Sequence, residues 1–97
     1  MEILSYHVEA RNLGGKERRV TVRECGLGSL FLRREHRDSM KESALDMAQK
    51  HWTADKVIIY PNGIAEAEVN NTLTAIRSYS EVRKNYRLAR AFPKVWC

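Results

Sequence analysis

Residues 57–69 have the sequence VIIYPNGIAEAEV, which predicts two neighbouring strands and the turn between them. Residues 57–60 are apolar on both faces, as in a strand near the middle of a sheet. The turn follows at once, because Pro61 presets φ and Gly63 can adopt the left-handed conformation that a hairpin needs. In residues 64–69 apolar side chains alternate with two glutamates, so one face of the returning strand is buried and the other is polar.

More strands are predicted before this hairpin. Residues 3–10 alternate between apolar and polar side chains, which is typical of a half-buried strand. Residues 12–16 (NLGGK) favour a hairpin connection to a second alternating strand at residues 19–23. After a Gly-Leu-Gly sequence, residues 29–35 suggest a third strand. The predicted apolar face of the first strand consists of Leu4, Tyr6, Val8 and Ala10.

Residues 39–52 predict a helix. Ser39 and Glu42 have the spacing of a capping box, in which each side chain satisfies a free backbone amide at the helix start. At 100° per residue the apolar side chains of this segment fall on one face, which would pack on the sheet. That face consists of Met40, Ala44, Met47, Ala48 and His51.

A second and longer helix is predicted from residue 72 to about residue 91, with Pro93 ending it. In projection this amphipathic helix has a narrow apolar stripe that includes Tyr79 and Tyr86, so we expect both tyrosines to face the core. A second stripe about a quarter-turn away is basic. It contains Arg83, Arg87, Arg90 and Lys94.

The predicted order is therefore β-β-β-α-β-β-α, in one domain covering residues 1–97. This order favours an α+β fold, with a mostly antiparallel sheet of four to five strands and helices on one face. No apolar run is long enough to cross a membrane, and the N-terminus lacks the basic and apolar regions of a secretory signal. Two cysteines, Cys25 and Cys97, are too few for a disulfide framework. We expect a cytoplasmic protein.

The net charge of +5 is concentrated near the C-terminus. Residues 1–69 contain eleven basic and eleven acidic residues, whereas residues 70–97 contain six basic residues and one acid, Glu81. Clustered positive charge attracts a polyanion or an acidic protein surface. A basic helix face that serves only solubility is the competing interpretation.

The predicted binding residues follow from this concentration of charge. Arginine suits the role because its planar guanidinium can bind phosphate or carboxylate through two hydrogen bonds, and Trp96 could anchor an interface. The predicted site consists of Arg77, Arg83, Lys84, Arg87, Arg90, Lys94 and Trp96. A secondary basic cluster of Arg33, Arg34 and Arg37 would extend the site if it folded beside the second helix.

Catalytic chemistry is not indicated. No two of the three histidines, His7, His36 and His51, have the spacing of metal ligands. The glycine-containing stretches lack the strand-to-helix context of a nucleotide-binding loop. We therefore expect no enzyme activity, metal, cofactor or small-molecule substrate.

Two functions fit the sequence. The first is a small binding protein whose basic helix docks on a nucleic-acid backbone or a nucleoprotein complex. The alternative is an inhibitor or adaptor of the phage or plasmid type, which binds and blocks a host protein complex. By analogy of size alone, the target of such an anti-CRISPR-like inhibitor could be a nucleic-acid-guided defence complex. RNA, DNA and an acidic protein surface are all compatible partners.

Overall fold

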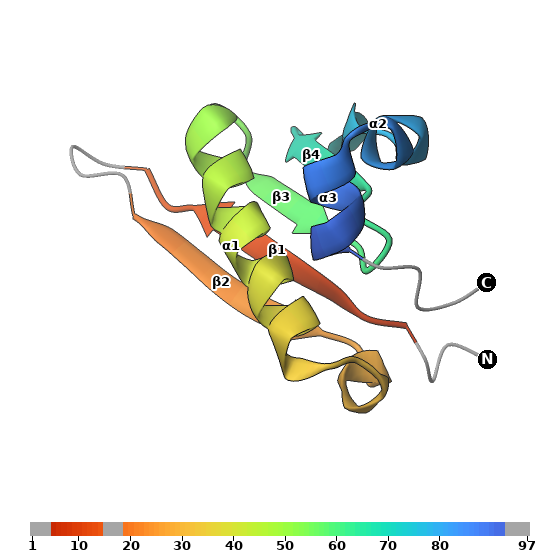
Figure 1. Ribbon diagram of the computed structural model, residues 1–97. Coiled ribbons are helices and arrows are strands. Elements are labelled where there is room, and N and C mark those ends of the chain that lie inside the picture. The colour runs from red at the N-terminus through yellow and green to blue at the C-terminus, as the bar shows by residue number, and fades with distance from the viewer. Residues whose placement is uncertain (1–4, 15–18, 93–97) are drawn as a thin grey trace.

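A computed structural model describes residues 5–14 and 19–92 of the chain. Its centre is a five-stranded antiparallel sheet in the order β2-β1-β3-β4-β5. The strands are β1 (His7–Asn12), β2 (Val20–Cys25), β3 (Lys56–Ile59), β4 (Ala65–Val69) and β5 (Thr72–Arg77). The helices are the 3-10 helix η1 (Gly28–Phe31), α1 (Arg34–Lys50), α2 (Tyr79–Lys84) and α3 (Tyr86–Ala91). Figure 1 shows α1 and α3 on the same side of the sheet, which confirms the predicted α+β fold with helices on one face.

The core lies between α1 and the sheet. Every second residue of β1 and β3 points toward α1, and every fourth residue of the helix points back, as the two periodicities require. Two of these helix positions are alanines, which let the helix approach the strands closely. The predicted buried faces are confirmed at Val8 and Ala10 of β1 and at Met40, Ala44 and Ala48 of α1, all fully buried, together with Val57, Ile59 and Ala65 of the sheet. Met47 and His51 are half-buried, and Leu4 lies outside the described residues.

The predicted hairpin between β3 and β4 is confirmed. The Tyr60 amide donates to the Ile64 carbonyl and the Gly63 amide donates to the Tyr60 carbonyl, both at 2.9 Å. Gly63 has a φ of 87°, and a Cβ at this position would lie 2.9 Å from a methyl carbon of Val82 in α2. The turn therefore requires glycine both for its backbone conformation and for the close approach of α2.

The prediction of a third strand at residues 29–35 is wrong. This segment contains η1, and α1 already begins at Arg34, so Ser39 lies inside the helix and caps nothing. The helix extends toward its N-terminus because His36 continues the buried stripe by one more turn. Its ring lies on Phe92 in an edge-to-face arrangement, with centroids 5.6 Å apart, and its Nε2 donates to the Pro61 carbonyl at 2.9 Å. These contacts are between distant segments and have no local signal in the sequence.

The single helix predicted over residues 72 to about 91 is also wrong. Residues 72–77 form β5, the edge strand next to β4. Val69 pairs with Thr72, and the two residues between them, Asn70 and Asn71, have φ values of 51° and 64°. Two consecutive positive φ angles define the type I′ turn that favours two-residue hairpins, and asparagine tolerates this conformation. The asparagines therefore turn the chain instead of capping a helix.

Beyond β5 the chain forms two short helices instead of one. Ser78 and Glu81 make a complete capping box at the start of α2. Asn85 ends α2 with extended backbone angles and caps α3, since its side chain accepts hydrogen bonds from the amides of Arg87 and Leu88. This break changes the projection on which the apolar and basic stripes were based. Pro93, predicted to end the helix, lies outside the described residues.

None of the helices in the described part of the chain has the length and hydrophobicity that a membrane crossing requires.

Candidate functional site

Four exposed cations gather on α2 and α3. They are Arg83 and Lys84 at the end of α2, and Arg87 and Arg90 on α3; we call them the basic surface. Within residues 5–14 and 19–92, none of the four takes part in a salt bridge. Glu81 lies nearby in sequence, but its carboxylate accepts a hydrogen bond from the Ser78 amide in the capping box. The positive charge of the basic surface is therefore balanced by little in its immediate surroundings.

Each of the two helices also pairs an arginine with a tyrosine four residues earlier. The Arg83 guanidinium lies 5.8 Å from the centre of the Tyr79 ring, and the Arg90 guanidinium lies 5.8 Å from that of Tyr86. This geometry is a cation–π contact, which holds the guanidinium near the ring while leaving its N–H groups free to bind an anion. Tyr86 is 73% exposed, so the prediction that it faces the core is wrong. Tyr79 is half-buried.

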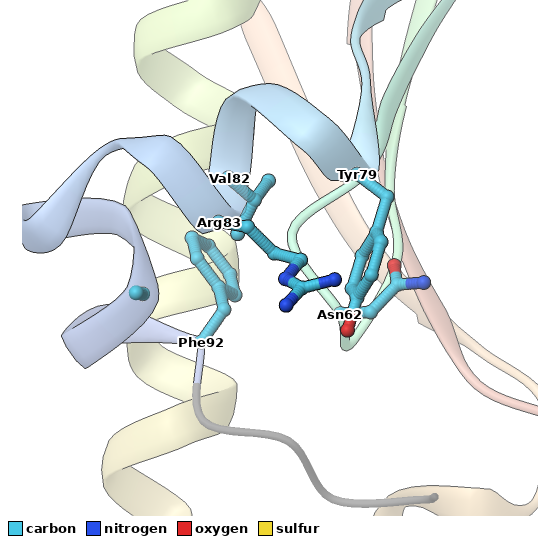
Figure 2. A pocket seen from close by; sticks show the side chains of 6 residues that line it. Asn62, Tyr79, Val82, Arg83 and Phe92 are labelled. Carbon is cyan, nitrogen blue, oxygen red and sulfur yellow. The ribbon is translucent and has the colours of Figure 1, made fainter.

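A hollow of about 330 Å³ lies between α2, α3 and the β3–β4 turn. In Figure 2 the Arg83 guanidinium and the Tyr79 ring extend into this space, and Phe92 lies on its other side. Asn62, from the turn, contributes an amide beside the Tyr79 hydroxyl. An anion entering here would meet a guanidinium, a phenol and an amide, while Phe92 supplies an apolar wall.

Arg77 differs from the other predicted binding residues because it is buried, with only 7% of its surface exposed. Its Nε donates to the Gly63 carbonyl at 2.7 Å and its Nη2 donates to the Ser43 hydroxyl at 3.0 Å. Its guanidinium also lies 5.3 Å from the centre of the Phe92 ring. Burial lowers the pKa of Arg77. Arg77 therefore connects β5 to α1 and to the β3–β4 turn, and it positions the wall of the hollow.

The secondary basic cluster lies at the start of α1, where Arg33 and Arg34 are exposed and Arg37 is half-buried. His36, within the same turn of helix, packs on Phe92 immediately after α3. Through His36, the start of α1 thus contacts the residue that follows α3. Lys94 and Trp96, which complete the predicted site, lie outside the described residues.

A second polar group occupies the face of the sheet that points away from α1. Glu9, only 6% exposed, receives His7 Nε2 at 3.2 Å, Arg23 Nε at 3.2 Å and Lys56 Nζ at 3.4 Å. Burial alone would raise the pKa of Glu9, but the hydrogen bond from His7 and the cations of Lys56 and Arg23 outweigh it, so the pKa is lowered. Cys25 lies directly opposite His7 in the β1–β2 pairing.

Sequence reasoning missed two features of these sites. The tyrosine–arginine pairs have a visible signal, a Tyr-x-x-x-Arg spacing that occurs twice, at Tyr79 and Tyr86. In the projection of one continuous helix, the two tyrosines fall in an apolar stripe and the arginines in a separate basic one. The proximity of His7 and Cys25 depends on strand register, and spacing along the chain does not reveal it.

No family model, curated protein or solved structure matches the chain.

Proposed function

We propose that this is a small non-catalytic binding protein whose basic surface docks on the phosphate backbone of a nucleic acid, free or within a nucleoprotein complex. The observation that carries the proposal is the group of four exposed cations on two consecutive helices with no salt-bridge partner in the described chain. Unpaired cations on adjacent elements create a positive potential that attracts a polyanion.

A repeating anion suits this arrangement better than a single one. The four cations are distributed along α2 and α3, and a nucleic-acid backbone presents phosphates in series. Arginine and lysine contacts to phosphate fix the position of a strand without reading its sequence. The exposed ring of Tyr86 adds a surface on which a base can stack, which is how many proteins hold single strands.

Fluorescence anisotropy with labelled single-stranded RNA, single-stranded DNA and duplex DNA across a salt series tests the proposal. Four phosphate contacts predict a slope of log K against log[salt] of about −2.8 for single strands and about −3.6 for duplex DNA. Between about 50 and 200 mM salt, the affinity should fall roughly 50- to 150-fold. Replacing Arg83, Arg87 and Arg90 together with alanine should weaken binding and reduce the slope by about 2 to 3.

The matched control removes three cations elsewhere. Arg11, Arg19 and Lys50 are exposed and lie outside the basic surface, so their combined replacement with alanine lowers the net charge equally. If both triple variants lose affinity to the same extent, attraction depends on total charge and the basic surface is not a site. If the Arg83/Arg87/Arg90 variant binds as tightly as the wild type, the proposal fails.

A protein partner is the second candidate. Two large apolar side chains are exposed at η1, Leu27 just before it and Phe31 at its last position, and exposed apolar groups of this size favour contact with another protein. An inhibitor or adaptor that blocks a protein complex would use such contacts with the basic surface. It would show no affinity for free nucleic acid even at low salt, and Trp96→Ala would weaken its hold on the partner.

A further inference from the structure

Three side chains of different chemistry converge on the face of the sheet opposite α1. The Nε2 or Nδ1 of His7, a carboxylate oxygen of Glu9 and the Sγ of Cys25 all lie within 4.8 Å of one another. His7 and Cys25 are direct neighbours across the β1–β2 ladder. Glu9 follows His7 by two residues on the same strand, so the pleat directs both side chains to one face.

We propose that His7, Glu9 and Cys25 form a binding site for a divalent cation of the zinc class. An imidazole nitrogen, a carboxylate oxygen and a thiolate sulfur are the three kinds of ligand that zinc uses in proteins. The mixed nitrogen, oxygen and sulfur set suits zinc better than magnesium or calcium, which prefer oxygen alone. Three protein ligands leave a fourth tetrahedral position open to water or to another donor atom.

The charges permit such a cation. The Glu9 carboxylate and a Cys25 thiolate together neutralise a charge of two. Lys56 lies 3.4 Å from Glu9 Oε1, but it also lies 3.7 Å from Glu68, which can retain the ammonium group when a cation takes its place at Oε1. The other oxygen, Oε2, is bound by Arg23.

Arg23 can then serve as an outer partner of the site. Hydrogen bonds to the free oxygen of a ligating carboxylate orient it and are a regular feature of metal sites. The Arg23 side chain is 69% exposed, so it can adjust as the carboxylate moves. Because Glu9 is buried on β1, its carboxylate has little freedom to move away from His7 and Cys25.

An entry path exists beside the cluster. His7 lines a hollow of about 450 Å³ whose other lining residues include Tyr60 and Glu66. The Tyr60 hydroxyl donates to Glu66 Oε1 at 2.6 Å, and the Tyr60 ring lies 5.9 Å from that of His7. A cation can therefore reach the imidazole from solvent without disturbing the helical side of the protein.

Cobalt(II) titration of the tag-free protein tests the site, because a cobalt–thiolate bond gives a charge-transfer band in the near ultraviolet. The experiment uses a Cys97→Ser background, in which Cys25 is the remaining cysteine. We expect the band to appear on adding Co²⁺ and to disappear when Zn²⁺ displaces it. At a hundredfold excess of Zn²⁺ over its Kd, the melting temperature should rise by roughly 10 °C or more.

Ligand variants and a matched control complete the test. Cys25→Ser should abolish the cobalt–thiolate band, and His7→Gln should weaken Co²⁺ affinity by more than about 100-fold. His51→Gln removes an imidazole at the end of α1 and should change neither the cobalt–thiolate band nor the Co²⁺ affinity. Absence of the band at millimolar Co²⁺, or equal Zn²⁺ stabilisation of the wild type and the Cys25→Ser and His7→Gln variants, would overturn the proposal. Both variants alter positions that are incompletely buried, so loss of the fold would not imitate these results.

Discussion

Arg77 and Arg87 belong to the same basic segment of the sequence, yet their surroundings differ completely. Arg77 is buried and donates hydrogen bonds to Gly63 and Ser43, whereas Arg87 is exposed on α3. A charged group that is hydrogen-bonded inside a protein contributes to stability, because its removal leaves buried acceptors without donors. The same residue type therefore supports the fold at one position and is available for binding at the other.

This difference predicts that alanine at one position lowers stability and at the other weakens binding. Arg77→Ala should lower the free energy of unfolding by about 2 to 4 kcal/mol, since two hydrogen bonds and the packing on Phe92 are lost together. Arg87→Ala should change it by less than about 0.5 kcal/mol and should reduce the salt slope of nucleic-acid binding by about 1. Urea denaturation and salt-dependent anisotropy measure the two quantities. Equal stability of the two variants would contradict the structural role of Arg77.

His36 predicts a pH dependence of stability. The ring of His36 is buried against Phe92 and Pro61, and the Arg77 guanidinium lies on the same Phe92 ring. Burial lowers the pKa of His36 from 6.5. The unfolded chain therefore binds a proton at higher pH than the folded protein does. Stability contributed by neutral His36 should be complete above pH 6.5 and should fall as the pH drops from 6.5 toward the lowered pKa, by up to about 1.4 kcal/mol per pH unit.

Urea denaturation of the wild type and His36→Gln between pH 7.5 and 5 measures this contribution. The variant can keep an N–H donor for the Pro61 carbonyl but does not titrate, so its curve should be flatter over this range. His51→Gln controls for the loss of an imidazole elsewhere. If His36→Gln is as sensitive to acid as the wild type, another group causes the loss of stability.

At the scale of elements, the turn between β4 and β5 decides whether residues 72–77 are strand or helix. Asn71→Gly should raise the free energy of unfolding by a few tenths to about 1 kcal/mol, because glycine adopts the positive φ of position 71 without steric cost. Asn71→Ala should lower it by about 1 kcal/mol. Thermal or urea denaturation of both variants is the measurement. A helix start at this position would give the opposite sign for glycine.

The elements that could be predicted from sequence are those with a complete local signal. The turn at residues 61–63 and the alternation around it are such a signal, and so is the four-residue spacing of Met40, Ala44 and Ala48. The sequence does not distinguish strand from helix at β5, because Asn70 and Asn71 suit both a helix cap and a type I′ turn. The pairing of β5 with β4, a contact with another element, decides in favour of the turn. The exposure of Tyr86 differs from the prediction because the helix breaks at Asn85, whose side chain caps α3.

At the scale of the whole molecule, the two proposed sites use different elements. Arg87 and Arg90 of the basic surface belong to α3, which shares a side of the sheet with α1, whereas His7, Glu9 and Cys25 lie on the face that points away from α1. Their tests are therefore independent, because loss of cobalt binding leaves the cations of α2 and α3 in place.

β1 and β3 pair in the middle of the sheet although α1 separates them in the sequence. The other ladders among the described strands, β1 with β2, β3 with β4 and β4 with β5, join consecutive strands. The described strands thus form two locally paired units, β1–β2 and β3–β4–β5. Closing the short loops within each unit costs less conformational entropy than forming the β1–β3 ladder that joins them. α1 contacts both β1 and β3. The segment that links the two units in sequence is therefore also the one that covers the seam between them.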